Sequence, residues 1–358
     1  MFIILYLLSS KFRAIALVDF DYFYAQCEEL RNPSYKGLPI AVCMLTGENT
    51  GAVASANYVA RAYGVKSGMP VKRAKSLAPN LVVLPVDINY YLSVSDKIMK
   101  RLKDEFNAVE QASIDEAYID LGEIEEEKAA EIGRKIKEIV KEAGGIKCTV
   151  GIGPNKLIAK MACDKAKPDG LKVVLPDEVK AFLESSQLSD IPYIGGKTAE
   201  KLKSLGITTV KEAQALSLED LIRIFGEKKG AMIYNFVRGI DERKVEERKA
   251  KKELEKFVPV KGRDPREALL EAARRLYERL NGRQFKEVGV IVIFEDLSSK
   301  TRSKTLKHPV SSFDELLSTA IQLLEDILKE AEGKKTRRVA VKASKFVKKE
   351  GNLLDYIS

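Results

Sequence analysis

The sequence contains no tryptophan, one histidine and four cysteines in 358 residues. No two cysteines form a C-x-x-C pair and His308 is the sole histidine, so the ligand spacing of a structural zinc site is missing. The cysteine spacing also indicates no disulfide framework, which makes a reducing cytoplasm the expected location. The cysteines are Cys27, Cys43, Cys148 and Cys163.

Long apolar runs are missing as well. The run from Met1 to Leu8 has eight residues, whereas a helix that spans a bilayer needs about 20. It lacks the basic start of a signal peptide, so we interpret it as a short extension before the first core strand and expect no membrane partner. The segment 151–156 lacks the spacing of a Walker P-loop, which removes the main support for an ATPase.

Excess positive charge is scarce in the first two thirds of the chain. Residues 1–240 hold 33 Lys and Arg against 31 Asp and Glu, whereas residues 241–358 hold 28 against 21. Most of the net charge of +9 is therefore in the last third. This excess is either a solvated basic surface or a footprint for a nucleic-acid backbone.

The hydrophobic pattern predicts an α+β fold with more than one domain. In the first half, strands are expected at 14–18, 39–44, 51–54, within 109–121 and at 146–151, with helices at 22–30, 57–63, 88–106, 125–143 and 155–166. Residues 176–239 show short helices only, and the highly charged segment 241–256 is typical of a linker. A βαββαβ order follows, with strands at 256–260, 288–295, 302–307 and 338–345 and helices at 265–280 and 312–332.

Three acids follow or interrupt predicted strands. Asp19 ends the first strand, and the neighbours Asp115 and Glu116 lie within a later β segment. Adjacent strand residues point to opposite faces, so Asp115 and Glu116 can share a site only if the backbone turns there, as at a hairpin tip. Carboxylates grouped in this way suit two divalent ions and a phosphoryl-transfer reaction. The alternative is that they are surface acids at strand ends.

A candidate phosphate grip lies elsewhere in the same half. Tyr58 and Arg61 are three residues apart on a predicted helix and therefore share a face, where they suit triphosphate oxygens. Lys156, Lys160 and Lys167 follow the strand near 150, and any of them could meet a phosphate. An ordinary packed Tyr–Arg pair and solvated lysines are the alternatives.

Four segments together resemble the Y-family, translesion DNA polymerases, most closely their archaeal DNA polymerase IV (DinB-type) branch. The segments are Val18–Gln26, Ala54–Arg61, Ser113–Tyr118 and Ala166–Gly170. The resemblance runs from about Arg13 to the C-terminus. It implies a right-hand architecture with a palm at 1–20 and 87–175, small fingers at 21–86, a helical thumb at 176–240, a linker at 241–256, a C-terminal α+β little finger at 257–348 and a tail at 349–358.

The resemblance also implies roles for individual residues. Asp19, Asp115 and Glu116, with the Phe20 carbonyl, match the ligands of two Mg²⁺ ions. Tyr24 matches a steric gate against ribose. The nucleotide contacts are implied to be Tyr22, Phe23, Tyr24, Ser55, Tyr58, Arg61 and Lys167, and the roof over the new base pair Met44, Ala52, Ala54 and Gly68. Small roof residues leave space above the pair, so low fidelity and lesion bypass are expected.

Two basic or glycine-rich regions are expected to grip DNA. The segment 191–202 resembles a helix-hairpin-helix in which Tyr193 replaces a usual glycine, and Gly195, Gly196 and Lys197 would bind a phosphate; a plain helix–helix turn is the alternative. In the last third the candidate DNA contacts are Arg302, Lys304, Lys307, Arg337, Arg338 and Lys342. The tail stands where relatives carry a sliding-clamp peptide but lacks paired aromatics, so clamp binding is left open.

The expected activity is template-directed addition of deoxynucleotides to a primer–template by a monomeric, Mg²⁺-dependent DNA polymerase. A nucleotidyl cyclase can share the palm and the two-metal logic, but it needs neither the hairpin-bearing thumb nor the basic C-terminal domain. A DNA-binding scaffold with an inactive palm would not need the three acids and Tyr24. Both are alternatives to the polymerase.

Overall fold

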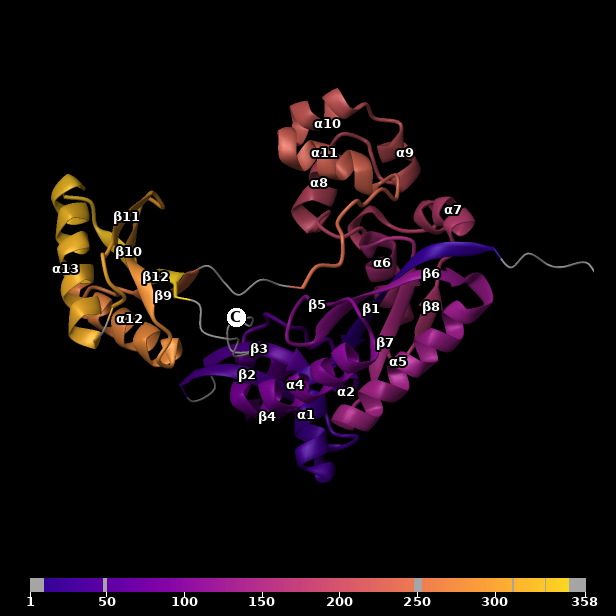
Figure 1. Ribbon diagram of the computed structural model, residues 1–358, viewed down its shortest axis with the longest axis horizontal. Helices are drawn as coiled ribbons and strands as arrows, with labels where there is room; N and C mark the ends of the chain where they lie inside the picture. The colour runs from indigo at the N-terminus through magenta and orange to yellow at the C-terminus, as the bar shows by residue number, and fades with distance from the viewer. Residues whose placement is uncertain (1–9, 48–49, 248–252, 311, 332, 348–358) are drawn as a thin grey trace, which may run out of the picture. The chain divides into compact units, whose positions relative to one another are not determined.

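The fold is taken from a computed structural model, which describes residues 10–47, 50–247, 253–310, 312–331 and 333–347. The expected N-terminal extension and the tail considered for clamp binding both lie outside the described residues. The chain forms two compact units, Met1–Arg248 and Lys249–Ser358, and each is described by itself (Figure 1).

The larger unit is organised around a five-stranded sheet in the order β5-β6-β1-β7-β8. The strands are β1 (Lys11–Phe20), β5 (Val109–Gln111), β6 (Glu116–Glu125), β7 (Cys148–Gly153) and β8 (Leu171–Val173). The central β1 pairs antiparallel with β6 and β7, and its apolar residues 14–18 are buried. The short β8, parallel to β7, was not predicted because three residues carry too little periodicity.

Helices pack around this sheet. They are α1 (Phe23–Arg31), α4 (Ile88–Glu105), α5 (Ala129–Gly144) and α6 (Lys156–Ala166). The predictions for α1, α4 and α6 are confirmed to within two residues, and Asn155 and Asp87 cap α6 and α4 as side-chain acceptors. The predicted start of α5 at Glu125 is wrong, because β6 continues to that residue and pairs it with Lys11.

A second, three-stranded sheet has its own small core. Its strands, in the order β3-β2-β4, are β2 (Ile40–Gly47), β3 (Thr50–Ala56) and β4 (Val82–Pro85), and its helices are α2 (Tyr58–Ala62) and α3 (Val71–Leu77). The predicted β2, β3 and α2 are confirmed. Sequence patterning did not indicate α3 and β4, which are only seven and four residues long.

The rest of the larger unit is helical, as predicted for residues 176–239. The helices α7 (Val179–Glu184), α8 (Gly196–Ser204), α9 (Val210–Gln214), α10 (Leu218–Phe225) and α11 (Glu227–Phe236) enclose an apolar cluster. Residues 241–247 then run back to the five-stranded sheet, where Val245 packs beside Ile15 and Leu17.

The smaller unit is a four-stranded antiparallel sheet in the order β11-β10-β12-β9, packed against two helices. Its elements are β9 (Glu253–Pro259), α12 (Pro265–Leu280), β10 (Phe285–Phe294), β11 (Ser299–Thr305), α13 (Phe313–Glu330) and β12 (Thr336–Phe346). The predicted βαββαβ order is confirmed. The first strand starts at Glu253 rather than at the expected Lys256, inside the segment interpreted as a linker.

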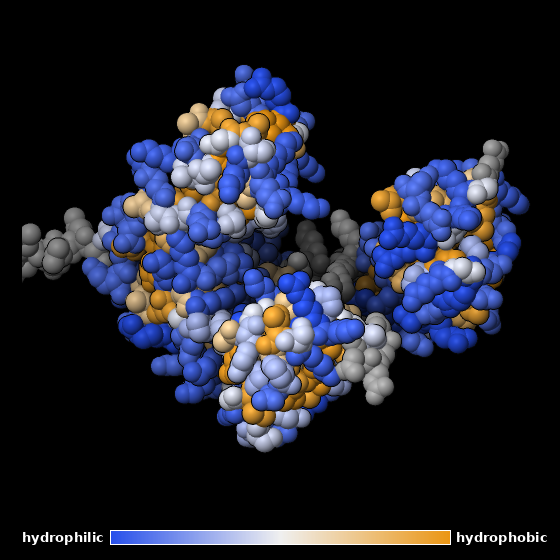
Figure 2. Space-filling model, turned by 180° about the vertical axis from the view of Figure 1, so that it is seen from behind, coloured by the Kyte–Doolittle hydropathy of each residue, from blue (hydrophilic) through white to orange (hydrophobic). Residues whose placement is uncertain are grey.

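On the face seen in Figure 2 both units present a mainly hydrophilic surface with small separate apolar patches. Within the described residues no helix is long and apolar enough to cross a membrane. The four cysteines are buried free thiols.

Candidate active site

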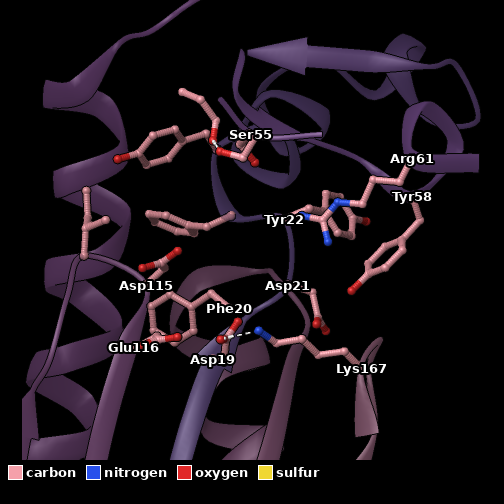
Figure 3. Close-up of a pocket in the computed structure, with 15 residues that line it drawn as sticks. Asp19, Phe20, Asp21, Tyr22, Ser55, Tyr58, Arg61, Asp115, Glu116 and Lys167 are labelled. Atoms are coloured by element: carbon pink, nitrogen blue, oxygen red, sulfur yellow. Dashed lines mark hydrogen bonds and ion pairs between the residues drawn. The ribbon is translucent and has the colours of Figure 1, made fainter. Parts of the chain in front are cut away.

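A pocket of about 310 Å³ opens where the two sheets of the larger unit meet. It brings together the end of β1, the start of α1, the end of β3, helix α2, Ser67, the β5–β6 hairpin and the residue after α6 (Figure 3). The lining residues that carry polar groups are Asp19, Asp21, Tyr22, Tyr24, Ser55, Tyr58, Arg61, Ser67, Asp115, Glu116 and Lys167. Phe20, Phe23, Ala54 and Ile114 complete the wall.

The backbone turns at Asp115–Glu116, as the shared site requires. Glu116 is the first residue of β6, and its carbonyl accepts hydrogen bonds from the backbone N–H groups of Ala112 and Ser113. Asp115 lies in the bend, where its carbonyl accepts from Phe20 N–H at 2.8 Å. Glu116 is the direct cross-strand partner of Asp19, so these two side chains share a face of the sheet. The predicted hairpin tip is confirmed.

Two lysines pair with Asp19 and Glu116. Lys167 Nζ lies 2.5 Å from Asp19 Oδ2. Lys160 Nζ lies 2.5 Å from Glu116 Oε1 and 3.5 Å from Asp19 Oδ2. Of the three lysines considered as phosphate contacts, only Lys167 lines the pocket, whereas Lys156 pairs with Glu110.

Burial perturbs the acids. It raises the pKa of Asp19 to about 7, helped by a hydrogen bond with Glu116 and opposed by Lys167. Burial acts in the same direction on Glu116, but the hydrogen bond with Asp19 and the charge of Lys160 outweigh it and lower that pKa. The hydrogen bond between the two carboxyls thus raises the pKa of Asp19 and lowers that of Glu116, so the two groups titrate as a pair. Burial also raises the pKa of Asp115, against a hydrogen bond that Ser113 Oγ donates at 2.5 Å.

The donor set fits a hard divalent cation. All three acids offer oxygen, and neither histidine nor cysteine lines the pocket, which suits Mg²⁺ better than zinc. Across the described ranges no group of three or more His, Cys, Asp or Glu side chains is arranged to hold a metal. The ammonium groups of Lys160 and Lys167 lie against Glu116 and Asp19, on oxygens that a cation would use.

Tyr58 and Arg61 lie together on α2, as their spacing predicts. The Arg61 guanidinium carbon is 4.8 Å from the centre of the Tyr58 ring, and Arg61 Nε donates to the Ala56 carbonyl at 2.8 Å. The ring of Tyr22 meets that of Tyr58 edge-on at 5.4 Å. This pair faces Lys167 across the pocket (Figure 3), so three polar groups converge on one space.

Tyr24 has a rigid support. Its ring stacks on Tyr91 of α4 with centroids 4.6 Å apart and planes 16° apart. Tyr91 is fully buried, and its hydroxyl donates to Glu28 Oε1 at 2.7 Å. Burial raises the pKa of Tyr24, with a smaller contribution from Asp115. Sequence reasoning missed Tyr91, because its only local signal is an aromatic residue on the apolar face of a helix.

The four predicted roof residues are not all at this pocket. Ala54 lines it, and its carbonyl accepts from Ser67 Oγ at 2.8 Å. Ala52 pairs with Met44 on the β2–β3 hairpin, and Met44 is 66% exposed. Gly68 follows Ser67 at a φ of 81°. Met44, Ala52 and Gly68 thus lie beyond the lining of the pocket as it stands.

The helical segment contains the expected glycine turn. Gly195 caps α8, and a side chain added at Gly195 or Gly196 would meet nothing within 4 Å. Tyr193 adopts a φ of 68°, the left-handed conformation that the usual glycine takes most easily. Its hydroxyl accepts from Arg243 Nη1 at 3.0 Å, and its ring meets Phe236. Lys197 is exposed at the start of α8.

The basic residues of the smaller unit separate into two groups. Arg302 and Lys304 are cross-strand partners of the core residues Val290 and Val288, and their side chains reach Glu330 and Gln322 on α13. By alternation, Arg338 and Lys342 on β12 point to the opposite, helix-free face. Arg337, Arg338 and Lys307 are exposed, whereas Lys342 pairs with Glu253.

Comparisons with known proteins agree with this architecture. The model of the impB/mucB/samB family matches residues 18–164, and its C-terminal domain model matches residues 258–355. A model described as the thumb domain of DNA polymerase iota matches residues 189–241.

Individual relatives match over nearly their whole length. A DNA polymerase IV of Nitrosopumilus maritimus is 40% identical over 95% of this chain and 97% of its own. A DNA polymerase IV of Saccharolobus solfataricus is 39% identical over 94% of this chain and 97% of its own. A solved Y-family DNA polymerase chimera of Dbh and Dpo4 aligns with a TM-score of 0.79 and 35% identity, over 94% of this chain and all of its own. The chain therefore belongs to the Y-family DNA polymerases, in the archaeal DNA polymerase IV branch.

Proposed function

We propose that this protein is a template-directed, low-fidelity DNA polymerase that adds deoxynucleotides to a primer 3′ end and bypasses damaged template bases. The observation that carries the proposal is the convergence of Asp19, Asp115 and Glu116 with Arg61 and Lys167 around one pocket. Solved insertion ternary and post-insertion binary complexes of Dbh DNA polymerase, 34% identical to this chain, support binding of a DNA substrate and a nucleotide.

Asp19, Asp115, Glu116 and the Phe20 carbonyl would hold two Mg²⁺ ions. When bound, such ions lower the pKa of the primer hydroxyl and neutralise charge on the triphosphate. The chain's own contribution is to keep these oxygens together, through the β1–β6 pairing and the Phe20 N–H bond to Asp115. Because Lys160 and Lys167 already contact the acids, each must give up part of those contacts when a cation enters.

Lys167, Arg61 and Tyr58 would bind the triphosphate, with Ser55, Tyr22 and Phe23 nearby. Arg61 keeps its Nε on the Ala56 carbonyl, which leaves its terminal nitrogens for phosphate oxygens. Lys167 would exchange Asp19 for a phosphate by rotation of its side chain. The N-terminal backbone of α1, which carries Tyr22 and Phe23, offers N–H groups on the same side.

Tyr24 would act as the gate against ribonucleotides. A 2′-hydroxyl would meet a ring that cannot yield, because Tyr91 lies stacked behind it. Above the base pair, Ala54 and the nearby Met44, Ala52 and Gly68 would form an open roof. Small residues at that position relax the shape check on the base pair, which supports low fidelity and lesion bypass.

We further propose the domain organisation expected from the sequence, with palm at 1–20 and 87–175, fingers at 21–86, thumb at 176–240, linker from 241 and little finger to 348. The expected linker end at 256 moves to before Glu253, where β9 of the little finger begins. The division into units between residues 248 and 249 supports the linker. Gly195, Gly196 and Lys197 would bind the DNA backbone, with Arg337 and Arg338 on the smaller unit. Arg302 and Lys304 would first have to leave Glu330 and Gln322. Action as a monomer in the cytoplasm is part of the proposal, and clamp binding stays open.

A primer-extension assay tests the proposal. The full chain should extend a labelled primer–template with Mg²⁺ and dNTPs, and Asp115→Ala or Glu116→Ala should abolish extension. Glu110→Ala, which removes a partly buried acid of β5 that lies outside the pocket, is the matched control and should retain extension. Absence of extension by the unmutated protein would refute the proposal, and cyclic nucleotide formed from ATP or GTP would favour the cyclase.

A further inference from the structure

Asp21 is a fourth acid of the pocket for which the proposed reaction has no role. It follows β1, two residues after Asp19, and its side chain is almost fully buried. We propose that Asp21 is a positioning residue: it anchors the loop 167–170 so that Lys167 is held in place for the triphosphate. This inference rests on the proposed function and adds a residue to it.

The partners of Asp21 distinguish it from the proposed metal ligands. Thr149 Oγ1 donates to Asp21 Oδ1 at 2.8 Å, and the Asp169 backbone N–H donates to Asp21 Oδ2 at 2.8 Å. Both oxygens thus bind fixed protein donors. Asp19 and Glu116, in contrast, contact lysine ammonium groups, which a cation can displace by rotation of the lysine side chains. Asp21 therefore connects parts of the protein rather than offering oxygen to a ligand.

The loop that Asp21 contacts is held on its other side as well. The Asp169 carboxylate receives Lys137 Nζ at 2.8 Å and Lys147 Nζ at 2.7 Å. Gly170 accepts from Val150 N–H at 3.1 Å, and a Cβ at Gly170 would lie 1.9 Å from the Ala166 carbonyl oxygen. The loop is thus fixed at residues 169 and 170.

Asp21 is itself held in place. Gln26 Nε2 donates to the Asp21 carbonyl at 2.7 Å and to the Lys147 carbonyl at 3.0 Å. The end of β1, the start of β7 and the loop after α6 therefore form one hydrogen-bonded block. From the loop after α6, the Lys167 side chain extends into the pocket, beside Asp21 in Figure 3.

This arrangement matters because the Lys167 ammonium group has to occupy two different positions. It now contacts Asp19 at 2.5 Å and Asp164 at 3.2 Å, and in the reaction it would contact a phosphate. A fixed backbone lets side-chain rotation make that exchange. A displaced backbone would move the ammonium away from the phosphate, and errors of about 1 Å in such contacts are costly.

The test is single-nucleotide insertion by the full chain, with KM for dNTP and kcat measured separately. Asp21→Ala removes the acceptor of the partly buried Asp169 N–H and frees the loop, so we expect KM to rise about tenfold. Asp21→Asn keeps one acceptor for that N–H, and its amide can donate to Thr149, whose hydroxyl also accepts. We therefore expect Asn to restore KM to within about threefold of the unmutated value.

A double-mutant cycle with Lys167→Ala shows whether Asp21 acts through Lys167. In that background Asp21→Ala should change KM by less than about twofold, because the group that it positions is gone. Asp120→Ala is the matched control: Asp120 Oδ1 also accepts a backbone N–H, from Gly122 at 2.9 Å, but on the strand β6 away from the pocket. It should leave KM unchanged.

Three outcomes would overturn the inference. The first is an additive effect of Asp21→Ala and Lys167→Ala on KM in the double-mutant cycle. The second is an unchanged KM in Asp21→Ala. The third is an Asp21→Asn variant whose KM is as high as that of Asp21→Ala and whose Mg²⁺ requirement is increased, which would make Asp21 a metal ligand. If circular dichroism shows that Asp21→Ala does not fold, Thr149→Val replaces it in the same cycle, because it removes the hydroxyl that donates to Asp21. If the unmutated chain does not extend primers, the proposed function fails first, and that result is distinct from all three.

Discussion

Replacing Tyr24 by alanine should abolish discrimination against ribonucleotides. Forcing an additional heavy atom against a packed, rigid side chain costs about 1–3 kcal/mol, which corresponds to roughly 5- to 150-fold in rate. The upper part of this range is expected, because the Tyr24 ring has Tyr91 stacked 4.6 Å behind it and cannot retreat. Tyr24→Ala should therefore raise kcat/KM for a ribonucleotide, relative to the matching deoxynucleotide, by about 100-fold.

The assay is single-nucleotide insertion of paired dNTP and rNTP substrates opposite the same template base. Tyr24→Phe keeps the ring and should keep the discrimination. Tyr91→Ala removes the support and should give an intermediate loss, since Tyr24 can then tilt. Unchanged sugar selectivity in Tyr24→Ala would refute the assignment of the gate, and unchanged selectivity in Tyr91→Ala would refute the role of the stack.

Further predictions concern charge and backbone. Lys160→Met should strengthen Mn²⁺ binding to the DNA-free protein by roughly fivefold, because it removes a positive charge that competes for Glu116. Electron paramagnetic resonance of free Mn²⁺ measures the affinity. Weaker binding would mean that Lys160 instead holds Glu116 in place. The pKa of Asp19 is raised to about 7 in the folded protein from an ordinary value of 3.8, so the folded state binds this proton more tightly than the unfolded chain. In EDTA the stability should therefore fall as pH rises from about 4 to about 7 and then level off; Asp19→Asn should flatten this part of the Tm profile, and an unchanged profile would contradict the reasoning. Tyr193 has a φ of 68°, so the Tyr193→Gly protein should have a free energy of unfolding about 1 kcal/mol higher than the Tyr193→Ala protein. Both variants lose the contact with Arg243, but only alanine is strained at this φ. Equal Tm values of the two variants would refute this.

The sequence predicted the central part of the site because its signals are local. Asp115 and Glu116 are neighbours, and geometry alone demands a turn if both serve one site. Tyr58 and Arg61 are one helical turn apart, so their shared face follows from the helix period.

Long-range contacts could not be predicted in this way. Tyr91 meets Tyr24 only because α1 and α4 pack together, and no local pattern specifies that pairing. The same holds for Asp21, whose partners lie more than 120 residues away. Alternation alone does not tell which face of an edge strand a helix covers, so the pairing of Arg302 with α13 also required the structure.

The turn at Asp115 constrains the number of residues in the β5–β6 hairpin rather than their identity. Side chains of β6 alternate between the faces of the sheet, and Glu116 faces Asp19 because the hairpin from Gln111 to Glu116 has its present number of residues. One residue inserted or deleted there would turn Glu116 to the opposite face while leaving every acid in the chain. The number of residues in this hairpin is therefore as strict a requirement of the site as the identity of its acids.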